Sequence, residues 1–118
     1  MLLDDDLTRL RHIRDAAKEG LGYVAGLDVE DFRKRRPLQH SVVRCIKIFG
    51  EATARLSAEL KESNAFVPWQ DMVGMRNRVI HAYFDIDIDV VWKTAKEDFP
   101  VLLTEVDRLT SAQEEAGQ

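Results

Sequence analysis

Apolar residues recur every three or four positions along two long stretches of the chain, and this helical period constrains the fold more than any other feature. In the stronger stretch, which covers about 23 residues, the apolar stripe comprises Leu38, Val42, Ile46, Phe49, Thr53, Leu56 and Leu60. The N-terminal stretch repeats the spacing at Leu3, Leu7, Leu10, Ile13, Ala17, Leu21 and Val24. Each stripe predicts an amphipathic helix that buries one side.

Turn and cap signals divide the rest of the chain into further helices. Gly26 is expected to end the first helix, and Asp28 can cap a short helix that follows it. Pro37 breaks or restarts the chain before the long helix. Pro68 suits the first turn of another helix, which we expect to run from residue 69 to about residue 83.

The segment DIDIDVV, residues 85–91, alternates like a strand, but the sequence offers it no second strand. We therefore expect no sheet here, and expect Asp87 or Asp89 to cap a last helix that runs to about Leu109. A calcium loop is excluded because its sixth position lacks glycine and Lys96 occupies the place of the bidentate glutamate. Pro100 should kink or split the last helix.

Four main helices with short connections predict an all-α, antiparallel bundle of four to five helices. The 118 residues are enough for one domain, which we assign to residues 1–111, with residues 112–118 as a disordered tail.

Charge and composition restrict the classes of function. A net charge of −4 argues against binding nucleic acid through the overall field, so any such contact must be local. The densest basic run, RKRR at residues 33–36, is typical of a solvated surface. No apolar run reaches the roughly 18 residues of a membrane span, and the acidic N-terminus does not resemble a signal peptide, so we expect a cytoplasmic protein.

The chain has one cysteine and three scattered histidines, a pattern that predicts neither a disulfide nor a metal site. Cys45 lies among apolar neighbours on the long helix and is expected in the core or at an interface.

The segment GMRNRVIHAYFD, residues 74–85, is the anomalous one. On an ideal helix Arg76 falls inside the apolar arc that includes Met72 and Val79. A buried guanidinium needs an anion, which either the internal carboxylate of Glu51 or the phosphate of a ligand could supply. His81 lies about 140° from Arg76 on the same ideal helix, so the two converge only if the helix end loosens, if the arginine reaches across, or if a second subunit faces them.

Arg76, His81 and Tyr83 form an R-x4-H-x-Y pattern, with Asn77 directly after the arginine. This pattern resembles the signature of HepT-like proteins of the HEPN superfamily. The likeness extends to LQHSVVRCIKIFGEATARLS and VPWQDMVGMRNRVIHAYFDIDIDVVW, and covers roughly residues 1–111.

The resemblance implies a helical homodimer whose motifs face a shared cleft. It implies a metal-independent endoribonuclease toxin without a cofactor, in which His81 moves a proton, Arg76 holds the RNA phosphate and Asn77 supports them. It also implies a partner nucleotidyltransferase antitoxin that adds AMP to Tyr83. The alternative is a non-catalytic helical module that docks a nucleotidyltransferase or a nucleotide.

Overall fold

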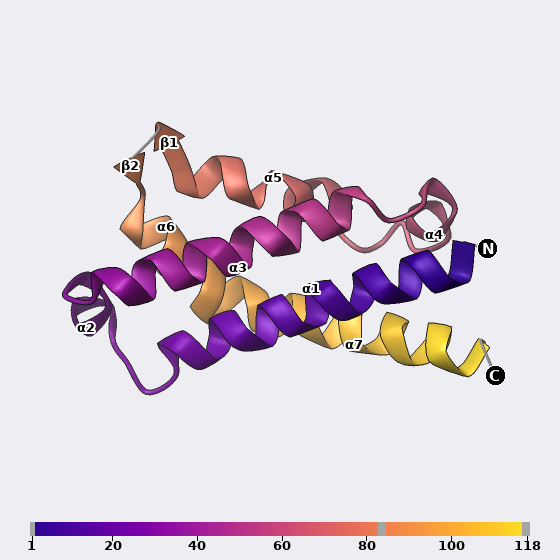
Figure 1. Cartoon of the computed structure of the whole chain (residues 1–118), viewed down its shortest axis with the longest axis horizontal. Helices are drawn as coiled ribbons and strands as arrows, with labels where there is room; N and C mark the ends of the chain where they lie inside the picture. Colours follow the sequence, from indigo (N-terminus) through magenta and orange to yellow (C-terminus); the bar gives the residue numbers. More distant parts are fainter. Residues whose placement is uncertain (1, 83–84, 117–118) are drawn as a thin grey trace.

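The protein folds into an elongated stack of helices (Figure 1). This computed structural model describes residues 2–82 and 85–116, and only the backbone of residues 2–4 and 80–82. The elements are α1 (Leu2–Val24), α2 (Val29–Arg33), α3 (Arg36–Ala54), α4 (Ala58–Ser63), α5 (Trp69–Val79), β1 (Ile80–Ala82), β2 (Asp85–Ile86), α6 (Ile88–Lys93), η1 (Thr94–Asp98) and α7 (Phe99–Ala116). The predicted all-α class is confirmed.

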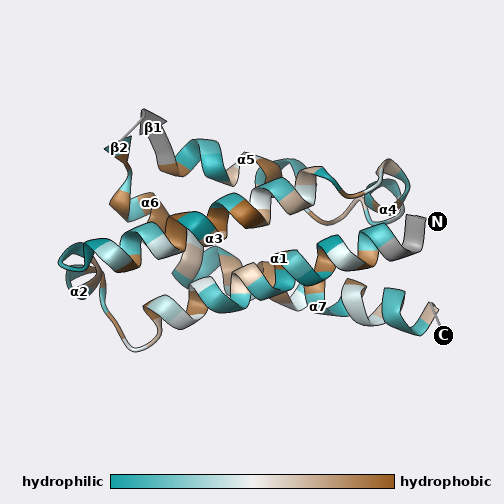
Figure 2. Ribbon diagram, in the orientation of Figure 1, coloured by the Kyte–Doolittle hydropathy of each residue, from teal (hydrophilic) through white to brown (hydrophobic). Residues whose placement is uncertain are grey.

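The core lies between α1, α3 and α7, and α5 packs along the other flank of α3. Every long helix presents hydrophobic residues on one side and hydrophilic residues on the other (Figure 2). The rings of Phe49 and Phe99 meet in the interior with their centroids 4.9 Å apart. In the part of the chain described, no helix combines the length and the apolar character needed to cross a bilayer.

Three helix boundaries follow the predicted signals. Gly26 adopts a φ of 76°, the left-handed conformation that glycine allows just after α1. The Asp28 carboxylate accepts a hydrogen bond from the amide of Asp31 at 2.8 Å, and the Asp31 side chain accepts one in return, which forms a capping box on α2. Asp87 caps α6 by accepting from the amide of Val90 at 3.2 Å.

Helix α3 ends at Ala54, six residues short of the predicted end at Leu60. The cause is a new helix start at Ser57, whose side chain caps α4 through the amide of Leu60. The buried carboxylate of Asp6 fixes this turn, because it accepts from the Ser57 amide at 2.9 Å and from its hydroxyl at 2.7 Å. Asp6 thus joins α1 to the α3–α4 connection.

Helix α5 approaches α3 closely at Gly50. A Cβ atom placed on Gly50 would lie 3.2 Å from the carbonyl oxygen of Val73 and 3.5 Å from that of Met72. A side chain here would make a tighter contact than is usual, so glycine favours this spacing between the two backbones. The position of α5, which carries the motif arginine, therefore depends on this glycine.

The expectation that residues 85–91 form no strand is wrong for its first two residues. Helix α5 ends at Val79 instead of continuing to residue 83, and the chain turns into β1, which pairs antiparallel with β2. The amide of Asp87 donates to the carbonyl of Val79 at 2.9 Å and closes the hairpin against the helix end. The second strand that the sequence did not reveal comes from the end of the expected helix itself.

The expectation that Pro100 splits the last helix is wrong, because helical residues continue through it from α6 to α7. Helix α6 passes into the π-helical turn η1, in which the amide of Phe99 donates to the carbonyl of Thr94 five residues earlier, and α7 follows directly. This wider turn accommodates the proline, which lacks an amide proton and crowds the preceding turn. Helix α7 then continues to Ala116, through most of the predicted tail, and Arg11 binds Glu114 at 2.7 Å.

Candidate functional site

Helix α5 is anchored at its N-terminal end by Trp69. Its indole N–H donates to the carbonyl oxygens of Lys61 at 3.2 Å and Asn64 at 3.0 Å, which joins α5 to the end of α4. Met72 and Met75 are buried against the core one turn further on. Both ends of α5 are thus fixed, the first by the indole and the second by the hairpin bond to Val79.

Arg76 is exposed, and the expectation that it lies within the apolar face of α5 is wrong. The buried residues of this helix are Trp69, Met72, Met75 and Val79, so the buried stripe is narrower than the ideal wheel suggests. The physical reason is that α5 packs mainly on α3 at the edge of the bundle, where a long arginine side chain reaches solvent.

The two arginines of α5 have different surroundings. Arg78 donates to the carbonyl of Asp71 at 2.8 Å and lies 3.9 Å from its carboxylate. Arg76 makes no hydrogen bond or ion pair with any residue that the structure describes, and Glu51 in particular does not pair with it. Within the described part of the chain, the guanidinium of Arg76 therefore has no anionic partner.

The other motif residues lie around the C-terminal end of α5. Asn77 is exposed beside Arg76. His81 has its backbone in β1, so the predicted 140° offset from Arg76 does not apply. Three helical steps of about 1.5 Å and two extended steps of about 3.3 Å advance the chain by roughly 11 Å from Arg76 to His81. Tyr83 lies outside the described residues.

Glu51 occupies an exposed position on α3 and does not pair with Arg76. It lines a cavity of about 280 Å³ between α1 and α3, together with Arg9, His12 and Arg55. No periodicity or motif in the sequence predicted this cavity, because it arises from the pairing of two helices far apart in the chain. The described side chains include no group of three or more histidines, cysteines, aspartates and glutamates close enough to hold a metal ion.

Cys45 is buried, as predicted. Its thiol donates to the carboxylate of Glu19 at 3.2 Å, and Arg44 also binds that carboxylate at 3.2 Å. Burial and the neighbouring Glu19 raise the pKa of the Cys45 thiol to about 12. The thiol stays protonated near neutral pH, so Cys45 does not act as a nucleophile there.

Comparisons with known proteins agree on one family. The model of the family described as "Ribonuclease HepT-like" matches residues 13–109. "Putative RNase MJ1380" of Methanocaldococcus jannaschii is 35% identical over 98 residues, which are 83% of this chain and 90% of that protein. "Probable ribonuclease HepT" of Thermococcus cleftensis is 40% identical over 80 residues, 68% of this chain and 73% of that protein.

A third relative, "Putative RNase TTE0752" of Caldanaerobacter subterraneus, is 35% identical over 97 residues, which cover 82% of this chain and 87% of that protein. No solved structure matches the chain. The family match covers most of the helical bundle, from α1 to α7, and includes the whole motif. The chain belongs to the HepT-like ribonuclease family.

Proposed function

We propose that this protein is a metal-independent endoribonuclease toxin of a toxin–antitoxin pair. One observation carries the proposal: in a family of ribonucleases, the exposed guanidinium of Arg76 has no acidic partner in the described chain and precedes His81 by only five residues. Arg78, on the same helix, is already engaged by Asp71. Family membership and the free guanidinium support a site for an anionic substrate centred on Arg76.

RNA carries its own nucleophile, so such a site needs few groups. The 2′-hydroxyl attacks the adjacent phosphorus, a new O–P bond forms and the bond to the 5′-oxygen breaks. The products are a 2′,3′-cyclic phosphate and a free 5′-hydroxyl. In this scheme His81 accepts the proton of the 2′-hydroxyl or supplies one to the leaving oxygen, transfers that an imidazole can perform in either direction.

Arg76 would hold the phosphate through two parallel N–H bonds and balance the charge that develops on its oxygens. Asn77, exposed beside it, would position either the phosphate or the imidazole. We place this site at a cleft shared by two copies of the chain, so that the partner subunit completes the wall opposite Arg76.

The first experiment measures cleavage of RNA in EDTA. The wild type should cut, Arg76→Ala should lose about 10²- to 10³-fold in rate, and His81→Ala about 10²- to 10⁴-fold. Arg78→Ala is the matched control, because it removes an arginine from the same turn that is already bound to Asp71. Equal cleavage by all four proteins would place the site elsewhere.

Control of the toxin is the second part of the proposal. A nucleotidyltransferase antitoxin would add AMP to Tyr83, whose adenylate phosphate would then compete with RNA for Arg76. Incubation with this transferase and ATP should add adenylate mass to the wild type and none to Tyr83→Phe. An unmodified wild type, or an equally modified Tyr83→Phe, would contradict this part while leaving the cleavage assay unaffected.

A further inference from the structure

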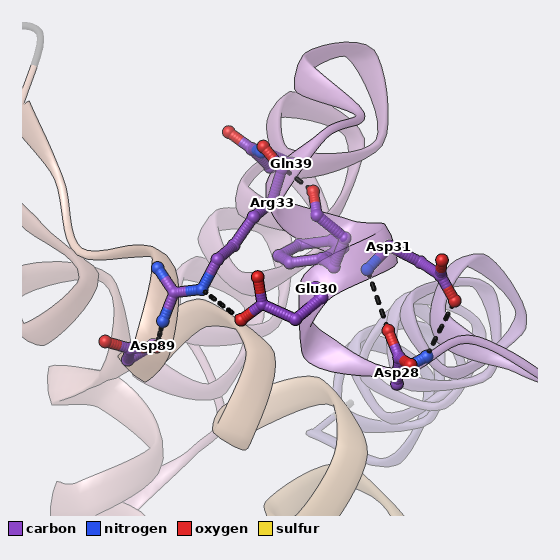
Figure 3. Close-up of polar contacts among 7 residues, drawn as sticks. Asp28, Glu30, Asp31, Arg33, Gln39 and Asp89 are labelled. Carbon is purple, nitrogen blue, oxygen red and sulfur yellow. Dashed lines mark hydrogen bonds and ion pairs between the residues drawn. The ribbon is translucent and has the colours of Figure 1, made fainter.

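The basic run at residues 33–36 divides into Arg33, which forms ion pairs, and three cations that form none with the described residues, although Arg36 donates to His40 at 3.4 Å. Arg33 binds Glu30 on its own helix at 3.3 Å and also binds Asp89 on α6 (Figure 3). It therefore joins α2 to the helix that follows the hairpin. Lys34, Arg35 and Arg36 are exposed, and none of them forms an ion pair within the described chain.

Lys34 is the C-cap residue of α2 and its charge attracts Asp28, whereas Arg35 and Arg36 pair with no acidic residue of the described chain. All three lie around the first residue of α3, where the helix dipole is positive, and the first turn of α3 contains no acidic residue. Adjacent like charges also repel one another. This exposed cluster of cations, in a chain with a net charge of −4, offers a local site of attraction for an external anion.

The same charge continues along the exposed side of α3 towards the motif. Arg44 and Lys47 follow Arg36 on that side, and both are exposed. Lys47 precedes Gly50 by three residues, and Gly50 touches the backbone of Val73, three residues before Arg76. Because α3 and α5 run in opposite directions (Figure 1), Lys47 lies at about the level of Arg76.

The basic residues of α3 are spread over a distance that a chain of phosphates can follow. Eleven residues of helix separate Arg36 from Lys47, which corresponds to about 16 Å along the axis of α3. Arg44 is held by Glu19 in a solvent-exposed pair of the kind that contributes little and exchanges easily. Between the unpaired cluster and Arg76 the exposed side of α3 therefore carries basic residues along its length.

We propose that Lys34, Arg35, Arg36 and Lys47, here named the basic ridge, bind the backbone of single-stranded RNA and lead it to Arg76. This inference rests on the proposed ribonuclease function and adds to it the path of the substrate. Contacts of this kind are independent of base sequence and strongly dependent on salt.

The test measures binding without cutting. The probe is a short, fluorescent, single-stranded RNA with 2′-O-methyl groups, which lacks the nucleophile. Lys34→Gln/Arg35→Gln/Arg36→Gln should weaken binding about 100-fold at 0.1 M salt, because each lost phosphate contact costs about 0.7 logarithmic units. The slope of log affinity against log salt should become shallower by about 2.

The matched control is Arg55→Gln/Lys61→Gln/Arg108→Gln, which gives the same net charge but changes cations near the opposite end of the molecule. It should bind nearly as the wild type does. An equal loss in both triple variants would mean that only overall charge matters and would overturn the inference. So would unchanged binding by the variant of residues 34–36.

Cleavage kinetics separate this inference from the proposed function. With ordinary RNA, the ridge variant and Lys47→Gln should raise KM and leave kcat unchanged, while thermal unfolding shows both to be folded. Cleavage by the wild type with unchanged KM in both variants would refute the ridge and leave the ribonuclease standing. Ridge-dependent binding without any cleavage would refute the ribonuclease and leave the ridge standing.

Discussion

Replacing Gly50 by alanine tests whether close contact between two backbones sets the position of the motif helix. The new Cβ would lie 3.2 Å from the Val73 carbonyl oxygen, which belongs to helical backbone and cannot rotate away. Overpacking of this kind costs about 1–3 kcal/mol. Alanine in place of helical glycine returns about 0.5–1 kcal/mol. The net expectation is a loss of about 1 kcal/mol, or about 4 °C in Tm for a domain of this size.

Gly74→Ala is the control on the facing helix. A Cβ at Gly74 meets nothing within 4 Å, so only the gain in helix propensity remains, and Tm should rise by about 2–4 °C. Thermal unfolding followed by far-UV circular dichroism gives both values. Gly50→Ala should also lower RNA cleavage more than Gly74→Ala, because only the former shifts α5. If Gly50→Ala were as stable as Gly74→Ala, the claim that this contact limits the spacing would be refuted.

Three further predictions concern titration and buried hydrogen bonds. The pKa of Cys45 is raised to about 12, so its contribution to stability is complete below the unfolded value near 9.0 and is lost as pH rises between them. Cys45→Ala should unfold with a weaker pH dependence in that window, and an identical dependence would contradict this. Asp6→Ala should cost about 2 kcal/mol in urea unfolding, because two hydrogen bonds from Ser57 are lost; Asp6→Asn, which keeps an acceptor, should cost less, and equal losses would refute the assignment. Hydrogen bonds to the Asp28 carboxylate, chiefly from the Asp31 amide, lower its pKa below 3.8. The advantage of the wild type in Tm over Asp28→Asn should therefore shrink as pH falls below that value, and a constant difference would contradict it.

The main helices could be predicted because their signals are local. The apolar stripes of α1 and α3 require only a helical period, and the cap at Asp28 requires only an acceptor near the free amides of the first turn. The same holds for Asp87 at the start of α6. Such features depend on residues within a few positions of each other, so a single sequence contains them in full.

The structure differs from the sequence-based prediction where contacts between residues far apart in the chain determine the local conformation. Helix α3 ends early because Asp6, about fifty positions away, binds Ser57. The hairpin forms because the end of an apparently continuous helix supplies β1. Neither partner is visible in the local pattern, which in both places continues the helical period.

The motif residues of the candidate site can be named from the sequence as a prediction, but their surroundings cannot. The motif pattern identifies Arg76, whereas its exposure depends on how little of α5 the neighbouring helices cover. Within the run at 33–36, Arg33 differs from its neighbours because it forms an ion pair with Asp89, and the fold brings these two distant residues together. The catalytic role of His81 and the modification of Tyr83 stay predictions.

The π-helical turn before Pro100 has a consequence for chain length. A bond that spans five residues encloses one residue more than an ordinary α-helical turn. Consider a chain in which alanine replaces Pro100 and one exposed residue of the turn, Lys96 or Glu97, is deleted. The turn would then close to regular α-helix, and Val91 and Phe99 would both keep their buried positions. Among related chains, one-residue length differences in the last helix should therefore fall here, and the longer chains should be those that carry the proline.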